Sequence, residues 1–216
     1  MKSAAARRPA LNFFPFPRFF LLPPVRGKSG GPRRGRFWLP ALVLALIPPL
    51  NLPGSPPPRE PVYFSQYDPR WKDEIMGDGK IETYGCLLSS LAIMLSRDIP
   101  GIDPSALNRY LRQNSGYTRG NLIVFARIDS YPASSFRFHS REDFSLGAIK
   151  SYLDRGWGVI AGFAGGSHWV YVLGYTGGGE ALSDYAYHDP GYNGRDQVFS
   201  PAQVPVTLRI FSRPGA

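Results

Sequence analysis

One thiol is the most reactive group that the sequence offers. The chain contains a single cysteine, Cys86, which follows Gly85 at the start of an apolar stretch. Apolar residues recur at helical spacing from Leu88 to Leu95, which predicts a helix that begins at Cys86. The free backbone N–H groups and the dipole of a helix N-terminus favour the thiolate, the nucleophilic form of cysteine. Free cysteines are also commonly buried as small apolar residues, so the position leaves both roles open.

His168 is the histidine best placed to act with this thiol. It begins an expected strand, 168–175, directly after the small loop 165–167. A histidine at the end of a strand can reach a partner in another layer of the fold, whereas one in mid-strand on a buried face is usually structural. His139 has no comparable setting, and we expect it to lie at the surface.

The partner of His168 depends on the turn that follows its strand. Glycines at 177–179 separate this strand from a second expected strand, 181–188, which predicts a β-hairpin. A two-residue turn would place Asp189 opposite His168, and a three-residue turn would place His188 there. The sequence leaves the register open. A carboxylate would orient the imidazole and stabilise its charged form, so the chemistry favours Asp189.

Gln66 is the fourth residue with a chemical role available to it. It lies in an expected loop, where a glutamine is otherwise unremarkable. A side-chain amide N–H beside the nucleophile, together with the backbone N–H of Cys86, would form an oxyanion hole for a tetrahedral intermediate. The order Gln66, Cys86, His168, Asp189 along the chain is the order of a papain-type site.

The elements expected to position these residues are helices in the earlier part of the domain and strands in the later part. Asp103 is followed by Pro104, which is typical of an N-cap and a first helical residue. From residue 157 the chain changes to aromatic and β-branched runs separated by glycines, which predict strands. This segregation favours an α+β domain with an antiparallel sheet. The expected helices begin at Cys86, Asp103 and Ser145, and the expected strands span 157–163, 168–175, 181–188 and 206–211.

Four blocks of the sequence resemble a known family. They read SQYDPRW at 65–71, YGCLLSSLAIML at 84–95, SHWVYVLGY at 167–175 and DPG at 189–191. In this order they resemble the signature blocks of bacterial peptidase-like proteins related to the bacteriocin-processing peptidases, which cleave double-glycine leaders. The stretch 107–121 is also similar to standalone members, and the resemblance covers about residues 62–213.

This resemblance implies a papain-like cysteine peptidase fold, with N-terminal helices packed on an antiparallel sheet. It implies Cys86 as the nucleophile, His168 as the base, Asp189 as the residue that orients the histidine, and Gln66 in the oxyanion hole. Acyl transfer by a thiol with these partners requires no metal and no organic cofactor. Many members have Gly-Pro-Thr after the cysteine, where this chain has Leu-Leu-Ser at 87–89. The resemblance is therefore to a subgroup of the family.

The positive charge of the chain is concentrated in its first part. The 216 residues carry a formal net charge of +9, with ten Lys/Arg and one Glu in residues 1–61 and fifteen charges of each sign in residues 62–216. Residues 62–216 are therefore neutral and lack the clustered Lys/Arg that nucleic-acid binding requires, so we expect no nucleic-acid partner.

The cysteine and histidine content excludes two further kinds of stabilising site. One cysteine excludes an intramolecular disulfide, and one cysteine with three histidines leaves few ligands for a zinc site.

Residues 1–52 form an expected leader that is basic and rich in proline. Arginines within 33–36 precede an apolar segment at about 37–50, which is shorter than the roughly 20 residues that span a bilayer. This order is typical of a secretory signal peptide or of an uncleaved signal anchor, and a Pro-rich disordered tail is the third interpretation. Residues 53–61 are expected to form a Pro-rich linker, and residues 62–213 the peptidase domain.

The sequence thus predicts an exported or membrane-tethered cysteine peptidase that hydrolyses peptide bonds in a peptide or protein substrate. The domain would lie outside the cytoplasm, secreted, periplasmic, or attached to a membrane through the N-terminal segment. Two alternatives stay open. One is a cell-wall peptidase or amidase that acts on peptidoglycan with the same Cys/His apparatus, and the other is a catalytically silent binding module with the same fold.

Overall fold

The computed structural model describes residues 59–192 and 194–214, which belong to the compact unit 53–216. The expected leader 1–52, its apolar segment and most of the linker 53–61 lie outside the described residues. None of the helices in the described part is both long and apolar enough to cross a bilayer.

Three of the five helices in the described residues begin where local sequence signals predicted them, whereas two four-residue helices, α1 Ile81–Tyr84 and α4 Ala126–Asp129, were not predicted. One begins at Cys86, as its apolar spacing indicated. The next begins after Asp103, whose carboxylate accepts a hydrogen bond from the N–H of Ala106 at 2.7 Å, which confirms the N-cap. The hydroxyl of Ser145 accepts one from the N–H of Ala148 at 3.1 Å and caps the last helix in the same way. The bounds of these three helices are α2 Cys86–Leu95, α3 Pro104–Gln113 and α5 Leu146–Leu153.

The described strands form a two-stranded sheet and a six-stranded sheet. Their bounds are β1 Ile75–Met76, β2 Gly79–Lys80, β3 Arg137–Asp143, β4 Gly158–Gly162, β5 Trp169–Tyr175, β6 Tyr185–Asp189, β7 Gly194–Val198 and β8 Thr207–Ser212. The larger sheet has the order β3-β8-β4-β5-β6-β7, and every neighbouring pair is antiparallel. The predicted α+β class with an antiparallel sheet is therefore confirmed, although its two edge strands, β3 and β7, were not predicted.

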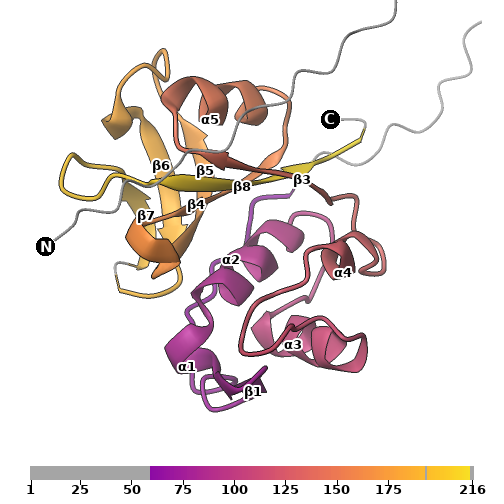
Figure 1. Cartoon of the computed structure of the whole chain (residues 1–216). Coiled ribbons are helices and arrows are strands. Elements are labelled where there is room, and N and C mark those ends of the chain that lie inside the picture. Colours follow the sequence, from indigo (N-terminus) through magenta and orange to yellow (C-terminus); the bar gives the residue numbers. More distant parts are fainter. Residues whose placement is uncertain (1–58, 193, 215–216) are drawn as a thin grey trace, which may run out of the picture. The chain divides into compact units, whose positions relative to one another are not determined.

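Both faces of the large sheet are covered (Figure 1). On one face Ile160 and Tyr171 belong to the buried cluster that also contains the apolar residues of α2. On the other face Val159 and Val172 belong to a second buried cluster, together with Ile149 of α5. Because successive residues of a strand point to opposite faces, central strands with two covered faces are apolar throughout instead of alternating. All residues of β4 are accordingly buried.

The hairpin loop between β5 and β6 is longer than predicted. β6 begins at Tyr185, so the expected strand at 181–188 is wrong in its first part. The carboxylate of Asp184 accepts hydrogen bonds from the backbone N–H groups of Glu180 at 3.0 Å and Ala181 at 3.1 Å. These bonds hold a short 3-10 helix, η2 Leu182–Asp184, within the loop in place of the first part of the strand.

The register of this hairpin also differs from both predicted registers. Tyr171 pairs with His188, a pairing that neither a two-glycine turn nor a three-glycine turn would produce. His168 immediately precedes β5, and Asp189 is the last residue of β6. Because the two strands are antiparallel, these residues lie at the same end of the strand pair.

A hydrogen bond as well as packing fixes α2 to the sheet. Every residue of α2 except Leu87 is buried, as expected for a helix that is apolar all round. The hydroxyl of Ser90 donates to the carbonyl oxygen of Trp169 at 3.1 Å. This bond ties the helix that begins at Cys86 to the strand that follows His168.

We expect Ser90→Ala to lower the free energy of unfolding by about 1 kcal/mol, the typical net contribution of one hydrogen bond. Urea denaturation measures this change. Ser89 is the matched control, because it is equally buried in α2 and its hydroxyl has no hydrogen-bond partner among the described residues. Ser89→Ala should leave the stability unchanged or increase it. An equal loss in both variants would contradict the role assigned to Ser90.

Candidate active site

Cys86 is the first residue of α2 and is 8% exposed. The junction between α1 and α2 requires glycine at position 85, because a Cβ there would lie 2.4 Å from the carbonyl oxygen of Ile81. This close approach allows α2 to begin directly after α1. The thiol therefore stands at the positive end of a ten-residue helix, where a negative charge on sulfur is stabilised.

His168 and Asp189 form a short hydrogen bond at the end of the strand pair. The distance from Nε2 of His168 to Oδ1 of Asp189 is 2.6 Å. The same carboxylate oxygen accepts a hydrogen bond from the backbone N–H of Gly191 at 2.7 Å. The side chain of Asp189 is 1% exposed and that of His168 is 15% exposed, so the pair is largely shielded from water. Asp189, and not His188, is thus the hydrogen-bond partner of His168.

A side chain at position 191 would disturb this pair. A Cβ on Gly191 would lie 2.6 Å from Cε1 of His168, closer than two such carbons can approach. Glycine at this position therefore allows the loop after β6 to pass against the imidazole ring while its N–H binds Asp189.

The surroundings of His168 favour its charged form. Burial lowers the pKa of His168, but hydrogen bonds to Asp189 and to Cys86, with the charges of both groups, outweigh burial and raise the pKa to about 9. Because Nε2 is occupied by Asp189, Nδ1 is the ring nitrogen left for the sulfur of Cys86. At neutral pH the arrangement suits an imidazolium held between a carboxylate and a sulfur.

Gln66 lies between α1 and the loop that follows Asp189. Its Nε2 donates to the carbonyl oxygen of Glu82 at 2.7 Å, and its backbone N–H donates to the carbonyl oxygen of Pro190 at 2.8 Å. The side chain is buried, and its Oε1 has no hydrogen-bond partner among the described residues. An amide nitrogen carries two hydrogens, so one N–H remains for a further acceptor. The role of Gln66 as an oxyanion donor beside Cys86 stays a prediction.

Three aromatic residues that sequence reasoning did not assign surround the pair. The ring of Phe163 stacks on that of His168 with centroids 6.0 Å apart, and the ring of Tyr192 lies 5.4 Å from the same imidazole. Tyr67 contacts Tyr192 at 6.3 Å. Burial and then a hydrogen bond with Tyr192 raise the pKa of Tyr67, as do the nearby charges of Asp189 and Cys86. Tyr67 directly follows Gln66, and this adjacency was the signal available in the sequence.

The side chains of the other two histidines have different partners. His188 is 4% exposed, its Nδ1 accepts a hydrogen bond from the N–H of Asp196 at 3.2 Å, and its ring contacts Tyr63. Burial lowers the pKa of His188. His139 is exposed, as predicted, and its ring packs against Trp157. Neither residue has the carboxylate and sulfur partners of His168.

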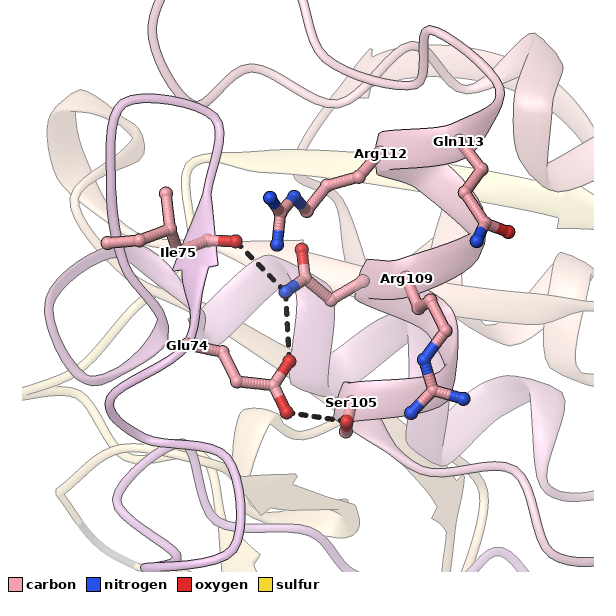
Figure 2. Close-up of a pocket in the computed structure, with 7 residues that line it drawn as sticks. Glu74, Ile75, Ser105, Arg109, Arg112 and Gln113 are labelled. Carbon is pink, nitrogen blue, oxygen red and sulfur yellow. Dashed lines mark hydrogen bonds between the residues drawn. The ribbon is translucent and has the colours of Figure 1, made fainter.

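A cavity of about 320 Å³ opens beside the imidazole of His168. A second cavity, of about 560 Å³, lies between β1 and α3 and has neither cysteine nor histidine in its lining. In this second cavity Glu74 accepts hydrogen bonds from Ser105 at 2.5 Å and from Asn108 at 3.1 Å. Figure 2 shows that Ser105, Arg109 and Arg112 extend from the same helix. The carboxylate of Glu74 therefore ties β1 to α3. The smaller cavity is the one that the hydrogen-bonded pair His168 and Asp189 lines.

Comparison of the chain with family models, with curated proteins and with solved structures gave no match in any of the three. Among the described residues, no three His, Cys, Asp or Glu side chains are grouped so that they could hold a metal ion.

We expect Asp189→Asn to lower the pKa of His168 from about 9, because the hydrogen bond to Asp189 is the strongest of the effects that raise it. NMR titration of the histidine rings measures this pKa. The matched control is Asp196→Asn, because Asp196 lies 3.8 Å from Nδ1 of His188 and 72% of its side chain is exposed. This control should lower the pKa of His188 and leave that of His168 unchanged. If Asp189→Asn does not change the pKa of His168, the hydrogen bond to Asp189 is not what stabilises the charged form of the imidazole.

Proposed function

We propose that the protein is a cysteine peptidase with a papain-like fold, in which Cys86 is the nucleophile and His168 is the acid/base. The observation that carries this proposal is the position of His168 between the sulfur of Cys86 and the buried carboxylate of Asp189, which raises the pKa of His168 to about 9. A nucleophile, a base within reach of it and a third group that orients the base are the signature of covalent catalysis.

The proposed reaction is acyl transfer from a peptide to the thiol and then to water. Before substrate binds, the proton of the Cys86 thiol would already reside on His168, and the thiolate attacks the carbonyl carbon of the peptide bond. The N–H of Cys86 and the free N–H of Gln66 would bind the oxyanion, and the imidazolium of His168 would give its proton to the leaving amine. His168 then removes a proton from water, which hydrolyses the thioester. Asp189 holds the ring and stabilises its charge throughout.

The papain-like fold is supported by the distribution of these residues between two layers. The nucleophile begins a buried helix, and the histidine and aspartate lie at the ends of neighbouring antiparallel strands packed against that helix. The site would then form where the two layers meet. Export or membrane tethering belongs to the same proposal and is supported by the composition of residues 1–52, which lie outside the described residues.

We expect Cys86→Ala to abolish hydrolysis of a panel of linear peptides and of peptidoglycan stem peptides by the purified protein. The variant removes the only sulfur nucleophile of the chain and, at a small buried position, should leave the fold intact. Mass spectrometry of the products measures the hydrolysis and also identifies the class of substrate. Turnover that survives the substitution would remove Cys86 from the mechanism.

The reactivity of the thiol separates an enzyme from a silent binding module. Iodoacetamide can label only one cysteine in this chain, so the labelling rate reports on Cys86 alone. We expect labelling of the folded protein at neutral pH to slow in His168→Ala, because the imidazolium that stabilises the thiolate is lost. His139→Ala, at an exposed histidine away from the pair, is the control and should label at the original rate. A folded protein that does not label would contradict the proposal.

Gln66→Met tests the oxyanion hole, because methionine keeps the length of the side chain and removes its N–H donors. We expect kcat for peptide hydrolysis to fall by about 100-fold or more, as when one oxyanion donor is removed from other hydrolases. Alkylation by iodoacetamide forms no oxyanion, so its rate should not change. A parallel loss of both rates would indicate that Gln66 supports the structure of the site and does not bind the oxyanion.

A further inference from the structure

The cavity beside His168 has an apolar lining that the proposed catalytic groups do not explain. Phe163, Ala164, Tyr192, Ala202 and Val204 contribute most of its walls, and the remaining lining residues are Gln203 and the hydrogen-bonded pair His168 and Asp189. Apart from this pair, the lining contains no charged side chain. At about 320 Å³ the cavity is at the lower end of the roughly 300–1,000 Å³ found for ligand pockets, a size that suits one or two side chains.

The position of the cavity relative to the two catalytic groups indicates which part of a peptide would enter it. His168 lines the cavity and Cys86 does not, so the cavity lies beside the imidazole and is not lined by the sulfur. During peptide cleavage the acyl group is bonded to sulfur, whereas the leaving nitrogen must contact the imidazole that protonates it. The Cα of the leaving residue is one bond, about 1.5 Å, from that nitrogen. Its side chain therefore projects beside His168.

We propose that this cavity binds the side chain of the residue that supplies the leaving amine, and that it selects a large apolar side chain such as leucine or phenylalanine. This inference rests on the proposed peptidase function. Phe163 and Tyr192 contact the imidazole ring and also line the cavity, so they position His168 and contact the substrate at the same time. Val204 lies at the open rim, where it is 45% exposed.

Competition between water and amines for the acyl-enzyme tests the proposal. The p-nitrophenyl ester of N-acetylglycine, whose acyl part has no side chain, would acylate Cys86. An added amino-acid amide then attacks the thioester: a C–N bond forms, the C–S bond breaks, His168 takes the proton of the amine, and the sulfur leaves as thiolate. This step is the reverse of acylation by a peptide, so the amine occupies the leaving-group side. Chromatography gives the ratio of N-acetylglycyl amide to N-acetylglycine.

We expect leucinamide and phenylalaninamide to trap the acyl-enzyme about ten-fold or more better than glycinamide or aspartic acid amide, a discrimination typical of apolar pockets. The ratio is measured within one acyl-enzyme, so it does not depend on how fast the ester reacts. Equal trapping by all four amides would overturn the proposal. If the ester is not turned over in a Cys86-dependent way, the peptidase function fails, and the subsite fails with it.

Two variants alter the cavity directly. Val204→Asp adds a carboxylate at the rim and should reduce the preference for leucinamide about ten-fold, whereas Ala202→Trp should fill the cavity and reduce trapping by phenylalaninamide most. The matched control is Val198→Asp, because Val198 is 56% exposed on β7 and does not line the cavity. Val198→Asp should keep the preference of the unmodified protein. Unchanged preferences in both cavity variants would overturn the assignment.

Discussion

The hydrogen bond between His168 and Asp189 is the interaction on which the arrangement of the site depends. A carboxylate that is 1% exposed must be matched by hydrogen bonds and by positive charge, because an unpaired buried charge costs several kcal/mol. Nε2 of His168 and the N–H of Gly191 meet this requirement at the carboxylate of Asp189. Two further bonds fix the backbone beside it: the hydroxyl of Tyr63 donates to the carbonyl oxygen of Asp189 at 3.1 Å, and the N–H of Gln66 donates to the carbonyl oxygen of Pro190. The segment before α1 is thereby attached to the end of β6, which brings Gln66 to the site.

The two faces of the large sheet are buried by different helices. One face packs against α2, which begins at Cys86, and the other packs against α5. The histidine and the aspartate belong to the end of a strand pair, so the thiol and its partners come from different layers. The hydrogen bond from Ser90 to Trp169 and the packing of α2 hold the helix in a fixed position on the sheet. A displacement of the helix along the sheet would separate the sulfur from the imidazole, so the stability of this contact and the chemistry of the site are linked.

The sequence predicted the three longest helices because their signals are local. The caps at Asp103 and Ser145 act within three residues, and the apolar spacing of α2 is contained in one segment. The central strands were recognised because their two covered faces make them apolar. β3 and β7 are edge strands with no buried residue, and their sequences, RFHSRED and GRDQV, are mostly polar. Their pairing is decided by the neighbouring strand and not by their own pattern, so composition did not indicate them.

Three features of the site followed from the sequence: the types of the reactive residues, their order along the chain, and the start of a helix at Cys86. Each of them depends on the residues themselves or on close neighbours. Which residue meets His168 did not follow, because that depends on the length of the loop between β5 and β6. The carboxylate of Asp184 folds that loop and displaces the register from both predicted turns. Tertiary structure alone decided that Asp189 is the partner, that Gly191 allows the ring to approach, and that an apolar cavity opens beside it, because these contacts join segments far apart in the chain.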